Sequence, residues 1–286
     1  MTSAADAAGG RAAIGVHGFP LPTVGEVDQG DLDAVAAAGL EVLSLYMTPE
    51  ERAQPGLWAD TLRGRIESAG LRLFSLAASA SKLLAHDEFE RRREVEEVAA
   101  GVAAVVAAGA ERLFVQPGGF NPEGPWWFHR ENFAPASRRA FARSLRELGQ
   151  LAEAGGVGIV LEGFQSSVVE STVVMRALIE EAGSPAVGAN LDYVNFLTPP
   201  AVARWPEALL RMADDLGPTM VSIHVKDCIV EPRLSCHVDE RPAGSGDLDL
   251  QPVIELGRRT GVPLLVEHLN ESTAEEAIRT LVQLAR

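Results

Sequence analysis

Four apolar segments in the second half of the chain each end in a side chain that can bind a metal ion. The segments read GIVLEGF, GANLDYV, VSIHVKD and PLLVEHL, and the residues concerned are Glu162, Asp192, His224 and Glu267. Their separations are 30, 32 and 43 residues, and one strand plus one helix of a (β/α)8 barrel takes roughly 30 residues. Four consecutive parallel strands would therefore bring these side chains to one rim. The pattern predicts a site for one divalent cation.

Each of these residues also has a structural interpretation. Glu162 could face solvent beyond its strand, Asp192 could cap a turn, and a lone histidine such as His224 is often a hydrogen-bonded core residue. Glu267 is harder to explain in this way, because an unpaired buried carboxylate costs several kcal/mol. Three carboxylates with one imidazole favour Mn²⁺, with Mg²⁺ or Co²⁺ as alternatives. Zn²⁺ is a further alternative, although zinc usually recruits more His or Cys.

The elements that must position these residues repeat along the chain. A helix-like stretch rich in Ala, Leu, Arg and Glu is followed by a glycine, a short loop and a nearly continuous apolar run. Glycine suits the position just past a helix, because it adopts the left-handed conformation without penalty. With the first strand, IGVHGF near residue 14, the repeat gives eight buried strands. The glycines are Gly39, Gly70, Gly109, Gly155, Gly183, Gly217 and Gly261.

Alternating strands and helices of the α/β class can form either a closed barrel or a doubly wound sheet. The segment after the first strand, HGFPLPTVGE, is not the GxGxxG fingerprint of a dinucleotide-binding sheet. Polar strand ends around much of the circuit favour a single (β/α)8 TIM barrel over residues 13–286, with residues 1–12 as a disordered lead-in. The longest non-periodic stretches are 117–135 and 228–247, and loops of that length are usually functional.

The composition of the chain indicates which classes of partner and which cellular location to expect. The formal net charge is −15, so the surface would repel a phosphate backbone and we expect no nucleic-acid partner. No run approaches 18 apolar residues, so we expect no membrane span. The N-terminus lacks the pattern of a signal peptide, and Cys228 and Cys236 are expected to be free thiols. These features indicate a cytoplasmic protein.

Other residues near strand ends or in long loops are candidate substrate contacts: His17, Gln116, Trp126, Trp127, Asn195, Lys226 and Arg241. Several have alternatives. His17 could be a buried histidine, and Lys226 could pair with an acid rather than bind a substrate oxygen. Trp126 and Trp127 could stack on a sugar or fill the interface of a homo-oligomer. His268, next to Glu267, is expected to point out of the barrel.

Two short motifs add to the strand-end residues. HVKD at 224–227 and the Gly-rich GSGDLD at 244–249 make the chain resemble the xylose-isomerase-like TIM barrels, the sugar phosphate isomerase/epimerase family. That superfamily holds sugar isomerases, ketose 3-epimerases, hydroxypyruvate isomerases, inosose dehydratases and, more distantly, the endonuclease IV group. The resemblance implies that Glu162, Asp192, His224 and Glu267 hold the metal. Many relatives carry His three residues after the Asp; here Asn195 stands there, which can bind a hydroxyl but cannot act as a base.

The resemblance also implies an activity. A metal-dependent isomerase or epimerase of a small sugar, ketose or hydroxy-keto acid would work through an enediolate, with Glu162 and Glu267 moving protons on opposite faces of the carbon. Loss of a β-hydroxyl from the same intermediate would make the protein a dehydratase, or lyase, of a keto-polyol such as an inosose. A nuclease or a non-catalytic metal or sugar binder is a third class, and the net charge of −15 counts against the nuclease.

Overall fold

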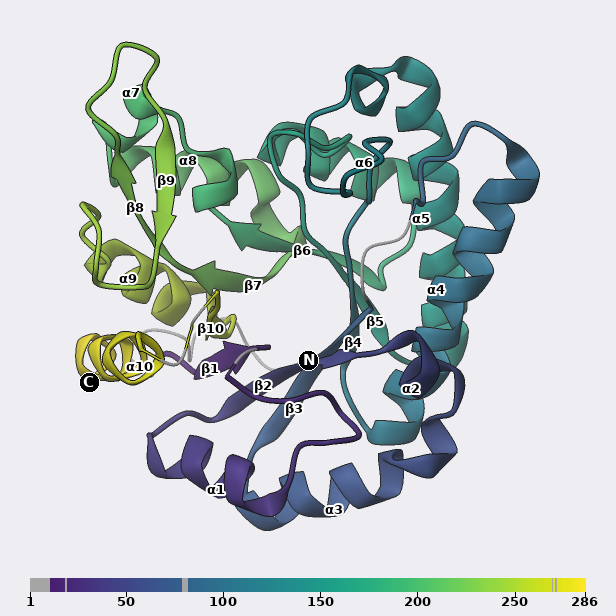
Figure 1. Ribbon diagram of the computed structural model, residues 1–286, viewed down its shortest axis with the longest axis horizontal. Helices are drawn as coiled ribbons and strands as arrows, with labels where there is room; N and C mark the ends of the chain where they lie inside the picture. Colours follow the sequence, from purple (N-terminus) through teal and green to yellow (C-terminus); the bar gives the residue numbers. More distant parts are fainter. Residues whose placement is uncertain (1–10, 19, 79–81, 269, 271) are drawn as a thin grey trace.

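The computed structural model describes residues 11–286 except 19, 79–81, 269 and 271. Most of the predicted lead-in, residues 1–10, therefore lies outside the described residues. Eight parallel strands close into a barrel in the order β1-β10-β7-β6-β5-β4-β3-β2. The predicted (β/α)8 barrel is thus confirmed, with its helices outside the ring of strands (Figure 1). The barrel strands are β1 Ile14–His17, β2 Val42–Met47, β3 Arg72–Ala78, β4 Arg112–Val115, β5 Gly158–Leu161, β6 Val187–Asp192, β7 Met220–Val225 and β10 Leu264–Val266.

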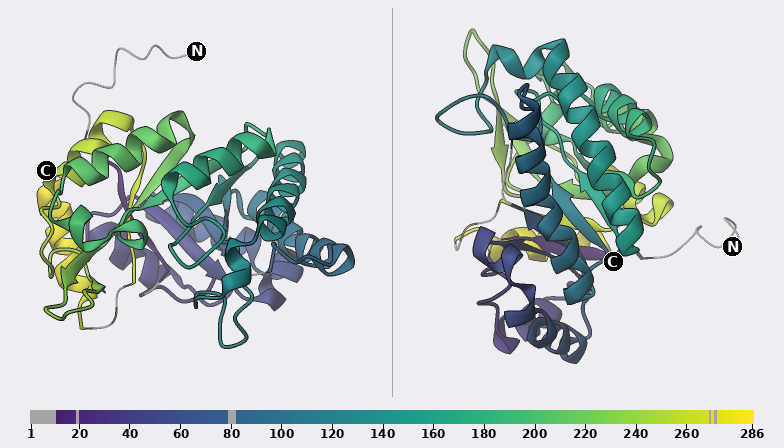
Figure 2. Two further views of the ribbon diagram at one scale, coloured as in Figure 1. Left: turned by 90° about the horizontal axis from the view of Figure 1, so that it is seen from above. Right: turned by 90° about the vertical axis from the view of Figure 1, so that its right-hand side faces the viewer.

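The helices follow the expected alternation. They are α1 Gln29–Ala37, α2 Pro49–Ala53, α3 Ala59–Ala69, α4 Glu88–Ala108, α5 Pro135–Gly155, α6 Thr172–Ala182, α7 Pro199–Val202, α8 Glu207–Leu216, α9 Gln251–Thr260 and α10 Ala274–Leu284. The long helices α4 and α5 pack side by side along one flank of the barrel (Figure 2). In the described part of the chain, no helix combines the length and apolar character needed to cross a membrane.

Glycines end several helices as the sequence predicts. Gly70, Gly109, Gly183 and Gly261 each take a left-handed conformation at the end of a helix. At α5 the prediction is wrong by one residue. Gly155 remains helical, and the next residue, Gly156, has φ 71° and ends the helix. Because two glycines stand in succession there, the sequence alone does not indicate which of them turns the chain.

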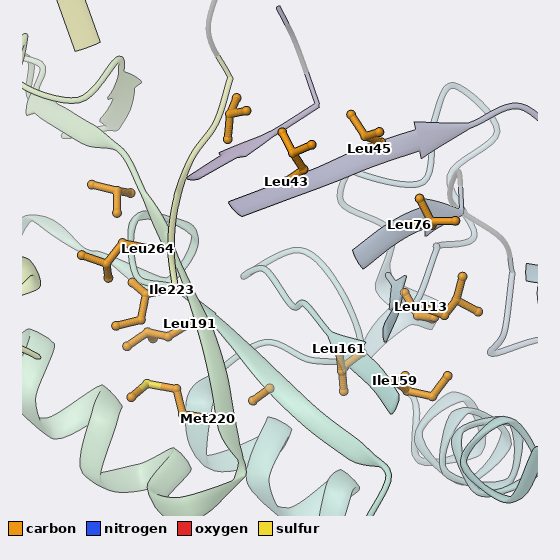
Figure 3. Close-up of a cluster of buried hydrophobic side chains, with 14 of the residues drawn as sticks. Leu43, Leu45, Leu76, Leu113, Ile159, Leu161, Leu191, Met220, Ile223 and Leu264 are labelled. Atoms are coloured by element: carbon orange, nitrogen blue, oxygen red, sulfur yellow. The ribbon is translucent and has the colours of Figure 1, made fainter. Parts of the chain in front are cut away.

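Alternation along the strands separates two apolar regions. Leu113 and Val115 on β4 belong to the large core between strands and helices, whereas Phe114 between them belongs to a separate small cluster. Ile159 and Leu161 on β5 flank Val160 in the same way. Since successive strand residues face opposite sides, Phe114 and Val160 point into the barrel. Figure 3 shows the outer set, which includes Leu43, Leu76, Leu113, Leu161, Leu191, Ile223 and Leu264.

The two predicted long loops contain structure of their own. Segment 228–247, with the preceding Asp227, holds the antiparallel hairpin of β8 (Asp227–Val230) and β9 (Val238–Arg241), which projects from the barrel (Figure 1). Segment 117–135 includes a short 3₁₀ turn at Arg130–Phe133. Cys228 and Cys236 are both free.

Candidate metal and substrate site

The four strand-end residues meet at the carboxyl end of the barrel. Asp192 ends β6, His224 lies on β7, and Glu162 and Glu267 directly follow β5 and β10. Each offers one oxygen or nitrogen, and these four atoms all lie within 4.8 Å of one another. All four side chains are buried. The sequence spacing therefore placed the groups correctly, because neighbouring parallel strands end at the same rim.

Several buried polar atoms of this cluster have close charged neighbours but, among the described residues, no hydrogen bond of good geometry. The Nδ1 atom of His224 lies 3.0 Å from Oε1 of Glu162 and 2.9 Å from Oε2 of Glu267. Among the described residues, neither ring nitrogen of His224 nor Oδ1 of Asp192 has a hydrogen-bond partner of good geometry. Buried polar atoms are almost always satisfied, so these orphaned atoms call for a ligand. Three carboxylates and one imidazole suit a hard divalent cation.

Neighbouring amides hold Glu162 in place. Gln116 donates through Nε2 to Oε2 of Glu162 at 2.7 Å, and Asn190 donates through Nδ2 to Oε1 at 3.0 Å. Ser222 in turn donates to Oδ1 of Asn190 at 2.7 Å. Both oxygens of Glu162 are thereby oriented, as is typical of carboxylates that bind metals. Gln116 lies where the sequence predicts a substrate contact, but part of its hydrogen-bonding capacity supports Glu162.

Lys226 is buried among the carboxylates and is not one of the residues that line the cavity. Its Nζ atom is 2.7 Å from Oδ2 of Asp192, 2.6 Å from Oε1 of Glu267 and 2.9 Å from Oε2 of Glu240. The first two contacts are close ion pairs without hydrogen-bond geometry. The side chain is 1% exposed. Of the two alternatives at Lys226, the structure therefore favours pairing with acids.

His17 is also buried beside the cluster. Its Nδ1 is 2.7 Å from Oγ of Ser44, and its ring centroid is 4.5 Å from that of His224. Burial, and then the nearby His224, lower the pKa of His17 to about 3. A neutral imidazole held by a serine is the structural alternative that the sequence left open. The structure does not place His17 on the cavity wall.

Three carboxylates share this buried cluster with two basic groups, His224 and Lys226. Burial would lower the pKa of His224, but Glu267 and Glu162 raise it to about 10. Burial would raise the pKa of Glu267, but His224 and Lys226 hold it well below its usual range. The pKa of Asp192 is raised well above its usual range by burial, which Lys226 only partly opposes. Without a metal, Glu267 and Glu162 thus favour a proton on His224. A bound divalent cation would displace that proton, because an imidazole nitrogen must be unprotonated to coordinate a metal.

A cavity of about 1000 Å³ opens above the cluster. Glu162 and Glu267 lie at its floor, and four of the predicted substrate contacts, Gln116, Trp126, Trp127 and Asn195, line it. The lining set also contains five residues that the sequence did not single out for the site: Tyr46, Pro125, Phe164, Glu240 and His268. Nothing in the sequence near Glu240 distinguished it from other exposed acids of a loop, because its place depends on the β8–β9 hairpin.

The prediction for His268 is wrong. Its backbone φ is 50°, so strand alternation ends before it and its side chain turns back to the cavity. Nδ1 of His268 lies 2.6 Å from Oε1 of Glu240. This positive φ is uncommon outside glycine and left no signal in the sequence.

Arg241 lies outside the cavity lining. Its guanidinium donates to the backbone oxygen of Glu240 and is 3.9 Å from Oε1 of Glu231. The Gly-rich loop beside it is held instead by Asp227 of the HVKD motif, whose carboxylate accepts hydrogen bonds from the amides of Gly246 and Leu248. A Cβ on Gly246 would lie 2.4 Å from that carboxylate, so this close approach requires glycine.

The sequence comparison shows to which protein family the chain belongs. Residues 32–286 match the model of the xylose isomerase-like TIM barrel family, and the chain belongs to that family. No curated protein sequence matches this chain.

Solved structures share the fold at low identity. 3-Keto-D-glucoside 4-epimerase from E. coli is 16% identical with a TM-score of 0.71, over 96% of this chain and 99% of that one. An L-ribulose 3-epimerase is 16% identical with a TM-score of 0.70, over 96% and 92%. A xylose isomerase-like protein from Mycobacterium smegmatis in complex with magnesium is 17% identical with a TM-score of 0.67, over 98% and 97%.

Proposed function

We propose that this protein is a divalent-metal-dependent isomerase or epimerase of a keto sugar or related hydroxy-keto compound. The observation that carries the proposal is the position of Glu162 and Glu267. Both carboxylates line the same cavity, and both approach Nδ1 of His224, from strands that β6 and β7 separate in the barrel. A carbon held above His224 would have a carboxylate on either side.

The residues that would hold the cation are Glu162, Asp192, His224 and Glu267. When bound, a divalent cation polarises a substrate carbonyl and lowers the pKa of the neighbouring C–H. The oxygen-rich donor set favours Mn²⁺ or Mg²⁺. A family member of the same fold is in complex with magnesium, which supports a hard cation.

Proton transfer is assigned to the two glutamates. One carboxylate removes the proton from the carbon beside the carbonyl, which leaves an enediolate, and the other returns a proton. Return to the opposite face inverts the carbon. Return to the adjacent carbon moves the carbonyl, with the hydroxyl proton passing to the former carbonyl oxygen. The contacts from Gln116 and Asn190 to Glu162, and from Lys226 to Glu267, hold both carboxylates in fixed orientations, as general acid–base groups require.

The cavity wall supports a carbohydrate substrate. Trp126, Trp127 and Phe164 present aromatic surface, while Gln116 and Asn195 present amides to hydroxyl groups. Structures of the same fold are named as sugar epimerases, which supports the same substrate class here.

A dehydratase acting on a keto-polyol is a second candidate. His268 and Glu240 are 2.6 Å apart and line the cavity with the two catalytic glutamates. Such a pair can protonate a departing hydroxyl. Glu162 or Glu267 would remove the carbon-bound proton. The β-hydroxyl would then leave as water with a proton from the His268–Glu240 pair, and the second glutamate would not return a proton to carbon.

Calorimetric titration with Mn²⁺ tests the metal site. Wild type should bind one ion, and His224→Ala should bind at least tenfold more weakly, because it removes the only nitrogen ligand. His237→Ala is the matched control, since His237 is exposed on the hairpin and should leave the titration unchanged. If His224→Ala bound Mn²⁺ like wild type, the assignment of the ligands would be wrong.

A further inference from the structure

The cavity is larger than its acidic floor requires. Its volume of about 1000 Å³ lies at the top of the ~300–1000 Å³ range of pockets that enclose drug-sized ligands. A single sugar ring placed at Glu162 and Glu267 would leave most of this space unfilled. Trp126, Trp127 and Phe164 give part of the remaining wall an aromatic surface.

The two tryptophans are held in place by their segment. Buried Asn132 accepts a hydrogen bond from the amide of Phe120 and donates one to the backbone oxygen of Ser166. Ser166 donates through Oγ to the backbone oxygen of Trp126 at 2.6 Å. These bonds tie the segment to the rim after β5. The Trp126 ring also packs on Phe164, with ring centroids 5.0 Å apart.

Trp127 depends on a glycine beneath it. A Cβ on Gly124 would lie 3.0 Å from the Trp127 ring, so the indole rests against the backbone. Despite this support, Trp126 is 41% exposed and Trp127 is 58% exposed. Exposed apolar patches mark ligand-binding grooves or protein–protein interaction sites, and here both indoles line the cavity.

The charges of the residues that line the cavity limit which ligands it can bind. Three carboxylates line the cavity, from Glu162, Glu240 and Glu267, and no Arg or Lys appears among the residues described as lining it. A phosphate group away from the proposed cation would therefore find no Arg or Lys among these lining residues and would lie near the carboxylate of Glu240. The ligand that fits is uncharged, with hydroxyl groups at one end and a flat or puckered ring at the other.

We propose that the substrate is an unphosphorylated glycoside with two rings. The reacting sugar ring lies over Glu162 and Glu267, and the second ring packs on Trp126 and Trp127. This inference rests on the proposed function for the first ring, and it adds the second ring and the absence of phosphate. Aromatic side chains bind such rings through their faces, which bury large areas.

Equilibrium binding tests the second ring without turnover. Titration calorimetry in the presence of Mg²⁺ would compare methyl glucoside with phenyl glucoside, as both anomers. Wild type should bind the phenyl compound of at least one anomer about tenfold more tightly, the ratio that corresponds to ~1.4 kcal/mol. Trp127→Ala should bring that ratio close to one. Phe128→Ala is the matched control, because Phe128 is adjacent and 68% exposed but does not line the cavity.

The outcomes separate the two proposals. Equal affinities for the methyl and phenyl compounds in wild type, including no binding by either, would overturn the two-ring inference. So would an equal loss in Phe128→Ala and Trp127→Ala. Catalysed hydrogen exchange on free ketoses with equal affinities would leave the proposed function intact and refute the second ring alone. A preserved phenyl preference without any exchange would support the second ring and refute the isomerase.

Discussion

At the scale of single residues, the proposed chemistry depends on two buried carboxylates, Glu162 and Glu267, which their neighbours hold in place. Glu267→Gln keeps the shape and one carbonyl oxygen but cannot accept a proton at neutral pH. A positioned acid–base group contributes about 10²–10⁴ in rate. Solvent hydrogen exchange into the substrate should therefore fall by about that factor, measured at saturating Mn²⁺. Glu162→Gln should show a similar loss if the two carboxylates act from opposite faces.

A different result would change these assignments. If only one variant lost exchange at saturating metal, one base would serve both steps. If excess Mn²⁺ restored full exchange to both variants, the glutamates would be ligands only, and the base would have to lie elsewhere in the cavity.

Lys226 should matter most when the metal is absent. Its ammonium contacts Asp192 and Glu267 at 2.7 and 2.6 Å, and loss of one partner of a buried ion pair costs about 3–5 kcal/mol. Lys226→Met should therefore lower the free energy of unfolding of the metal-free protein by about that amount. A bound cation replaces part of the lost charge, so Mn²⁺ should raise Tm more in the variant than in wild type.

The chain offers a matched control, because its other lysine, Lys82, is exposed. Lys82→Met should leave the effect of Mn²⁺ on Tm unchanged. Equal Mn²⁺ shifts in wild type and Lys226→Met, measured by differential scanning fluorimetry, would show that Lys226 does not stabilise the carboxylates.

At the scale of elements, α4 and α5 are joined by an ion network. Arg91, 0% exposed, contacts Glu88 on its own helix and Glu147 on α5, each at 2.7 Å. Hydrogen bonds from Arg91 and Arg92 lower the pKa of Glu88 from 4.5 to about 2. The stabilisation from this lowered pKa is complete above pH 4.5 and is lost as pH falls toward 2.

The network predicts a pH-dependent difference between variants. Between pH 5 and pH 3, wild type should lose more stability than Glu88→Gln, because the variant has no proton to take up at this position. Urea unfolding midpoints at the two pH values measure the loss. Glu96→Gln, an exposed change on α4, should behave like wild type; if Glu88→Gln also lost as much as wild type, the network would not carry the effect.

The elements that the sequence predicted well are those with strong local signals. Seven apolar runs preceded by glycines, together with the first run near residue 14, correspond to the eight barrel strands, and the candidate metal ligands at the ends of four of them lie close together. The β8–β9 hairpin was missed, because each strand has only four residues and all of them except Asp227 and Cys228 are half-buried. Since Glu240 reaches the cavity only through that hairpin, its role was missed as well.

At the scale of the whole molecule, barrel closure brings together residues that are far apart in sequence. The sequence could indicate which side chains end strands, but not how deep each one lies. His17 and Lys226 were candidate substrate contacts, and barrel closure buries both, His17 against Ser44 and Lys226 against Asp192. His268 was expected outside and faces the cavity. How deeply each side chain is buried depends on packing between strands across the barrel, and local sequence patterns do not carry that information.

Isotope exchange with and without metal tests whether the protein removes a carbon-bound proton from a sugar in a metal-dependent reaction. The protein would be incubated in D₂O with a panel of unphosphorylated ketoses and keto-glycosides, with either Mn²⁺ or EDTA, and the sugars analysed by mass spectrometry. Metal-dependent proton transfer by Glu162 and Glu267 predicts that at least one sugar gains a carbon-bound deuterium with Mn²⁺, that EDTA abolishes the gain, and that Glu267→Gln lacks it. Exchange that persists in EDTA, or a metal-loaded protein that exchanges no sugar of the panel, would contradict it.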